Sequence, residues 1–166
     1  MGLPMPQPKR SSSSRNKLPY PYPTSAAVTA AMKGNRRVDT RPEVALRSEL
    51  HRRGLRFRKE VALRPAARLR RVDIVFPAAR LAVFVDGCFW HQCPDHGNKP
   101  RANTSYWSTK LARNVARDAE VNRELNAAGW GVIRVWEHED SIEAADAIER
   151  EYRRRLRLGA RMQRRS

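Results

Sequence analysis

The stretch VDIVFPAARLAVFVDGCFWHQCPDHG, residues 72–97, contains two short apolar runs and then a loop dense in metal-ligand side chains. The runs at 72–76 and 81–85 are rich in valine and phenylalanine, and the Pro-Ala-Ala between them predicts a β-hairpin. Both cysteines of the chain and two of its four histidines follow within residues 88–96. The stretch therefore predicts strands that end at a metal-organised site.

The flanking sequence predicts an α/β domain with a mixed sheet. In chain order we expect a helix from a Thr40/Glu43 capping box to Gly54, a strand at 57–63, the hairpin, a helix from Thr104 to Gly129, a strand at 132–136, and a last helix capped by Ser141. Trp136 is expected in the core of the domain.

The charge of the chain is concentrated at its two ends. Its 166 residues include 34 basic and 17 acidic ones, a net charge of +17. Seven basic residues and no acidic one lie in 1–38, and the same holds for 153–166. This balance indicates a polyanionic partner such as nucleic acid, because Lys and Arg contacts to phosphate release counterions. The alternative is the basic tail common in arginine-rich proteomes.

Composition divides the chain into three parts. Residues 1–30 are rich in Pro, Ser, Lys and Arg and predict a disordered basic arm. Residues 31–140 predict one folded domain, and residues 141–166 predict a basic helix or tail.

The cysteine count and the apolar runs bear on the compartment of the protein. Two cysteines are too few for a disulfide framework, and no run approaches the ~20 apolar residues of a membrane span. We therefore expect a cytoplasmic protein that does not bind a membrane.

Four side chains suit a zinc site. Cys88, Cys93 and His96 offer three ligands within nine residues, and tetrahedral zinc needs a fourth. His138 is the best candidate, because it follows the strand at 132–136, whose end can reach the loop if that strand lies near 81–85. Four protein ligands would make the site structural. The alternative is two buried thiols with surface histidines.

Two carboxylates suit a magnesium site. Asp73 begins one strand of the hairpin and Asp86 ends the other, so antiparallel pairing would bring them together. Two close carboxylates attract Mg²⁺, which keeps several waters and binds substrate phosphates. Taken singly, Asp73 is explained by a capping role or by pairing with Arg70 or Arg71, and Asp86-Gly87 is explained by a turn.

Other side chains of the loop suit work on DNA. His91, held between the two cysteines, can activate water or protonate a leaving oxygen; otherwise it is a surface histidine or an unused ligand. Phe89, Trp90 and Trp107 are candidate wedges, because aromatic side chains beside phosphate-binding groups can insert between bases. Alternatively, one of the three, with Trp107 the first choice, packs against the sheet.

These residues together resemble a known family. The resemblance is to the very-short-patch-repair (Vsr) DNA mismatch endonucleases, and it covers about residues 32–140 in order and with similar spacing. The segments that carry it are TRPEVALR (40–47), VDIVFP (72–77), FVDGCFWHQCPDHG (84–97), NTSYW (103–107), KLARNVARD (110–118) and GWGVIRVWEHE (129–139).

The resemblance implies a restriction-endonuclease-like α/β fold, a mixed sheet flanked by helices, with one structural zinc site. It implies Mg²⁺-dependent nicking of duplex DNA 5′ to the thymine of a T·G mismatch, left by deamination of 5-methylcytosine. A functional link to a DNA cytosine methyltransferase follows from the same resemblance, and we expect a monomer.

The site residues of the family fall on matching positions of this chain. The implied catalytic residues are Asp73, His91 and Glu43; the implied zinc ligands are Cys88, Cys93, His96 and His138; the implied wedges are Phe89, Trp90 and Trp107. Asp86 stands where the best-characterised pattern has histidine. This change is towards the two-carboxylate site of restriction nucleases, and it leaves the division of labour between Asp86 and His91 open.

Two other functions remain possible from the sequence. One is a related restriction-like nuclease without mismatch preference. The other is a non-catalytic, zinc-dependent DNA-binding module, which would explain the charge and the ligands but gives no reason for Asp73 and Asp86 to meet.

Overall fold

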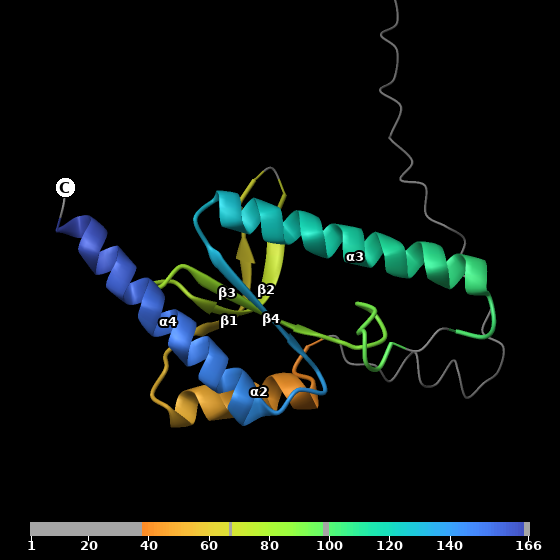
Figure 1. Ribbon diagram of the computed structural model, residues 1–166, viewed down its shortest axis with the longest axis horizontal. Helices are drawn as coiled ribbons and strands as arrows, with labels where there is room; N and C mark the ends of the chain where they lie inside the picture. Colours follow the sequence, from red (N-terminus) through yellow and green to blue (C-terminus); the bar gives the residue numbers. More distant parts are fainter. Residues whose placement is uncertain (1–37, 67, 98–99, 165–166) are drawn as a thin grey trace, which may run out of the picture.

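The structure, a computed structural model, describes residues 38–66, 68–97 and 100–164. Within this part three helices surround one four-stranded sheet (Figure 1). The elements are α2 (Arg41–Arg52), β1 (Arg58–Leu63), β2 (Arg70–Phe76), β3 (Leu81–Asp86), α3 (Thr104–Ala127), β4 (Gly131–Trp136) and α4 (Ser141–Gln163). The order of helices and strands expected from the sequence is confirmed.

The sheet is mixed, as the sequence predicts. Its strand order is β1-β2-β3-β4; β2 pairs antiparallel with both β1 and β3, and β4 joins β3 in parallel after the crossover through α3. The parallel register runs from Leu81 opposite Gly131 to Asp86 opposite Trp136. Because β3 and β4 end side by side, the loop after β3 lies next to the segment after β4.

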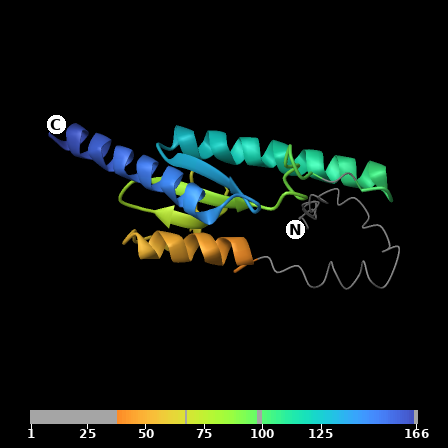
Figure 2. The same cartoon turned by 60° about the horizontal axis from the view of Figure 1, so that its bottom comes forward.

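Helices cover both faces of the sheet. Leu50 of α2 and Ile148 of α4 belong to the core on one face, whereas Val121 and Leu125 of α3 pack against the other face (Figure 2). This arrangement explains why the run at 81–85 is apolar at every position, since a strand that is buried on both faces has no polar side.

The last helix begins inside the core. Ala145 and Ile148 of α4 are fully buried, and Leu156 still packs against the core, whereas the C-terminal end of the helix extends past the sheet (Figure 1). The segment predicted at 141–166 as a basic helix or tail thus contributes to the domain at its start. The arm predicted at 1–30 lies outside the described residues.

Three local predictions were wrong in detail. Thr40 makes no side-chain capping bond to the helix; its hydroxyl donates instead to the Glu43 carboxylate, at 2.9 Å. Asp140, rather than Ser141, accepts the first free N–H groups of α4. Trp136 is half-buried and lines a surface hollow, because the alternation of side chains along β4 directs Val135 into the core instead. None of the described helices is long and apolar enough to cross a membrane.

Candidate active site and metal centre

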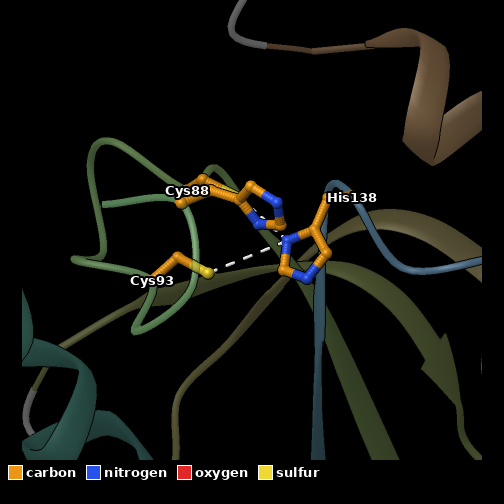
Figure 3. A group of neighbouring side chains, drawn as sticks. Cys88, Cys93 and His138 are labelled. Carbon is orange, nitrogen blue, oxygen red and sulfur yellow. Dashed lines mark hydrogen bonds between the residues drawn. The ribbon is translucent and has the colours of Figure 1, made fainter. Parts of the chain in front are cut away.

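The four predicted zinc ligands lie together where β3 and β4 end. The candidate ligand atoms of Cys88, Cys93, His96 and His138 all lie within 4.8 Å of one another. Nδ1 of His138 is 3.0 Å from Sγ of Cys88 and 3.7 Å from Sγ of Cys93 (Figure 3). The parallel pairing of the two strands brings these residues together, although His138 lies 45 residues beyond Cys93 in sequence.

The loop that carries the ligands is closed by its own backbone. The N–H of Cys93 donates to the carbonyl of Cys88 at 2.9 Å, and the N–H of Gly97 donates to the carbonyl of Cys93 at 2.8 Å. A Cβ at position 97 would lie 2.4 Å from that carbonyl oxygen, so only glycine fits there. The Glu137 carboxylate accepts the N–H of Cys88 at 2.7 Å and ties the loop to the end of β4.

The thiols themselves are suited to a metal. Burial, the neighbouring Cys93 thiol and then Glu137 raise the pKa of Cys88 to about 11. The Cys88 thiol therefore keeps its proton unless a cation is bound beside it. Two sulfur and two imidazole ligands are a donor set that suits tetrahedral zinc.

Asp73 lies in a strongly acidic environment. Its Oδ2 accepts the N–H of Val85 at 2.8 Å, so its side chain bridges β2 and β3. Burial raises the pKa of Asp73 to about 6; the Val85 N–H acts in the opposite direction, and the charges of Glu43, Glu60 and Asp86 add to the rise. A carboxylate that other acids repel is stabilised by a divalent cation, so Asp73 fits a magnesium ligand.

Glu43, in the first turn of α2, is one of the acids whose charge acts on Asp73. It is only 6% exposed, and its carboxylate accepts the N–H of Asp39 at 3.0 Å and Nη1 of Arg47 at 3.3 Å. These contacts, together with the Thr40 hydroxyl, fix the Glu43 carboxylate in place. Glu43 therefore has two roles at once: it accepts a backbone N–H just before α2, and its charge raises the pKa of Asp73.

His91 is held by an acid that the sequence did not single out. Its Nδ1 lies 2.5 Å from Oδ2 of Asp118 on α3 and 3.6 Å from Oδ1 of Asp86. Burial acts to raise the pKa of Asp118, but the His91 hydrogen bond and the charge of Arg134 outweigh it and hold that pKa below its ordinary value. With Nδ1 engaged, Nε2 is the nitrogen of His91 that remains for proton transfer.

Asp86 is bonded to a second residue that sequence reasoning missed. Nη1 of Arg134 lies 2.7 Å and 2.6 Å from its two carboxylate oxygens. The charge of Asp86 also adds to the rise of the Asp73 pKa, and a metal shared by the two carboxylates stays a prediction. One signal in the sequence was available: Arg134 interrupts the apolar run of β4, and a charged residue in a buried strand requires a partner.

The three predicted wedges form one aromatic cluster. The ring of Phe89 lies 5.0 Å from Trp90 and 5.4 Å from Trp107, and Tyr106 adjoins Trp107 at 5.3 Å. The ammonium of Lys110 is 5.3 Å from the Trp90 ring. Phe89, Trp90 and Trp107 are all half-buried, so the cluster keeps apolar surface in contact with solvent.

Fold and site together define a class of protein. Asp73 within β2, Asp86 at the end of β3, a histidine bonded to an aspartate, and half-buried aromatic side chains next to a lysine are groups that suit a nuclease.

Comparison with known proteins identifies the family within this class. The sequence model of the family described as DNA mismatch endonuclease Vsr matches residues 23–96. The type II nicking enzyme V.NaeI of Lentzea aerocolonigenes is 54% identical over 118 residues, which are 70% of this chain and 71% of the relative. V.XorIIP of Xanthomonas oryzae pv. oryzae is 44% identical over 65% of this chain and 77% of its own length. The DNA mismatch endonuclease Vsr of Escherichia coli is 38% identical over 60% of this chain and 62% of its own length. The chain belongs to the Vsr family of DNA endonucleases.

Proposed function

We propose that this endonuclease nicks duplex DNA 5′ to the thymine of a T·G mismatch that arises by deamination of 5-methylcytosine. The resemblance of residues 32–140 to mismatch endonucleases supports this specificity, and a DNA cytosine methyltransferase would be its functional partner. A restriction-endonuclease-like fold and a monomeric state are part of the same proposal.

The observation that carries the proposal is the acidic cluster at Asp73, next to the His91–Asp118 pair. Asp73 would hold Mg²⁺ with Asp86 as the second carboxylate, and Glu43 would complete the acidic environment. When bound, magnesium supplies positive charge at the scissile phosphate and a site for water. This role would explain why Asp73, Asp86 and Glu43 act on one another in a protein whose proposed ligand is a polyanion.

The side chains around the phosphate would have separate roles. Nε2 of His91 would take a proton from the attacking water or give one to the leaving oxygen, with Asp118 fixing the ring. Phe89, Trp90 and Trp107 would enter the duplex beside the mismatch, because their half-buried cluster presents aromatic faces on which bases can stack.

The Cys88, Cys93, His96 and His138 cluster would bind one structural zinc ion. Its four ligands come from the loop after β3 and the segment after β4, so the ion would fix the loop that also carries His91. No open ligand position is needed for this role.

A second candidate function rests on the relatives. Several of those that match this chain are named type II nicking enzymes, and the one from Lentzea aerocolonigenes is more than half identical to it. A nicking enzyme without mismatch preference is therefore the alternative. Membership of an endonuclease family favours both candidates over a non-catalytic DNA-binding module.

One assay tests the proposal. End-labelled duplexes with a T·G mismatch in a cytosine-methyltransferase site, and the matched duplexes with C·G or T·A, are incubated with Mg²⁺ or with EDTA. Nicking of the T·G strand alone, with Mg²⁺ alone, supports the proposal. Equal nicking of matched DNA supports the second candidate, and nicking in EDTA contradicts the magnesium assignment.

A further inference from the structure

Arg134 is a half-buried cation in the middle of an apolar strand. It lies opposite Phe84 in the parallel β3–β4 register, and its guanidinium carbon is 4.7 Å from the centre of the Phe84 ring. The side chain of Arg134 is only 21% exposed. A guanidinium in such an apolar place costs free energy unless its N–H groups are hydrogen-bonded, so the partners of Arg134 indicate its role.

All three guanidinium nitrogens of Arg134 have partners at the candidate active site or next to it. Nη1 contacts both carboxylate oxygens of Asp86, at 2.7 Å and 2.6 Å. Nη2 lies 3.3 Å from Oδ1 of Asp118, and Nε donates to Oδ1 of Asn122 at 3.1 Å. One planar cation thus joins the acid at the end of β3 to the acid on α3 that holds His91.

This bridge connects two groups with different roles. Asp86 belongs to the acidic cluster around Asp73, whereas Asp118 orients His91. The Nδ1 atom of His91 lies within 3.6 Å of both acids. Without Arg134, the carboxylates of Asp86 and Asp118 would lie on either side of one imidazole without the guanidinium that bonds to both of them.

We propose that Arg134 is the positioning residue of the active site, which fixes Asp86 and Asp118 and thereby His91, and that it competes with the divalent cation for Asp86. The proposal rests on the nuclease function proposed above. Because Arg134 occupies both oxygens of Asp86, the metal must displace part of this contact to use Asp86, whereas Asp73 carries no comparable ion pair in the described structure. The arginine therefore determines how the two carboxylates share the metal.

The test compares Arg134→Met with a matched control. Arg70→Met removes a buried arginine that also joins the sheet to α3, but through Glu124, at 2.8 Å and 3.0 Å, and not through Asp86 or Asp118. We expect Arg134→Met to lower kcat for T·G nicking by about tenfold or more with DNA affinity little changed, because small displacements of catalytic groups cost rate. Arg70→Met should lower Tm without this loss of kcat.

A second measurement does not depend on activity. Mn²⁺ is titrated calorimetrically into the zinc-loaded protein without DNA. Removal of the competing charge should strengthen Mn²⁺ binding by about tenfold in Arg134→Met, and Asp86→Asn added to that variant should cancel the gain. Arg134→Lys should keep the weak wild-type Mn²⁺ affinity but lose part of kcat, since one ammonium cannot hold both acids in a planar fork.

The possible results separate the two proposals. Unchanged kcat in Arg134→Met would overturn the positioning role, and unchanged Mn²⁺ affinity would overturn the competition for Asp86. If the wild-type protein fails to nick any duplex, the proposed function fails, while the Mn²⁺ titrations still decide whether Arg134 controls Asp86. Equal kcat losses in Arg70→Met and Arg134→Met would show a structural effect only and contradict the proposal.

Discussion

Replacement of Asp73 by asparagine should stabilise the folded protein and abolish nicking. Asparagine keeps an oxygen that can accept the Val85 N–H but carries no charge to be repelled by Glu43, Glu60 and Asp86. A rise of the Asp73 pKa from 3.8 to about 6 corresponds to about 3 kcal/mol. Allowance for the partial solvent access of this carboxyl leaves about 1–2 kcal/mol, or ~3–6 °C in Tm for a chain of this size.

The stability gain should depend on pH in a defined direction. Between pH 3.8 and about 6 the folded protein holds the Asp73 proton more tightly than the unfolded chain does, so this contribution to stability is present in acid and is lost as pH rises. Asp73→Asn has no such proton. The difference in Tm between variant and wild type should therefore be near zero at pH 4 and complete above pH 6.5.

The difference in Tm between Asp73→Asn and the wild type is measured by thermal unfolding, followed by circular dichroism at pH values from about 4 to 7.5, in EDTA-free buffer without Mg²⁺. Addition of Mg²⁺ should then raise the Tm of the wild type towards that of the variant and leave the variant unchanged, because only the charged site binds the ion. A variant that is less stable than the wild type at pH 7.5 would refute the electrostatic reasoning. Wild-type nicking by the variant would refute the assignment of Asp73 to the metal.

The remaining predictions concern the zinc cluster, the histidine and the N-terminal arm. Cys88→Ser should lose zinc and lower Tm by about 10 °C or more, because binding of a structural metal contributes folding free energy; equal zinc content in mutant and wild type, measured by atomic absorption, would contradict the site. Asp118→Asn should lower kcat by about tenfold and leave DNA affinity intact, as single-turnover and binding assays can show, and an unchanged kcat would remove Asp118 from the mechanism. Deletion of residues 1–30 removes four basic residues, so the slope of log K against log salt should become shallower by up to about 3.6, and an unchanged slope would mean that the arm does not contact phosphate.

Most of the fold could be predicted because its signals are local. The apolar runs at 72–76 and 81–85 are short and rich in β-branched residues, and Pro77 marks the turn between them. Gly54 and Gly129 both have positive φ, at 76° and 80°, and both follow the helices that they were expected to end. Details of helix capping were wrong because several residues near each start can accept the same N–H groups, and only the packed structure selects one.

The candidate site was only partly predictable, for a different reason. Ligands such as Cys88 and Cys93 are close in sequence and chemically distinctive. Asp118 and Arg134 are ordinary residue types for a helix and an arginine-rich chain, and their roles depend on the packing of α3 over the end of β3. A contact between side chains 27 residues apart, such as His91 with Asp118, has no local signal.

His91, the residue proposed to transfer a proton, lies in the same loop as the proposed zinc ligands. It lies between Cys88 and Cys93, and its own N–H donates to the carbonyl of Gly87 at 3.1 Å, so its backbone belongs to the same closed turn as the proposed zinc ligands. Its side chain is instead fixed from α3, by Asp118. Loss of zinc should therefore reduce activity by more than the loss of folded protein explains, because the backbone of His91 would move while Asp118 stayed on its helix. The proposed proton transfer therefore requires both the backbone of His91, held by the metal-binding loop, and its imidazole, held by Asp118 of α3, to be in place.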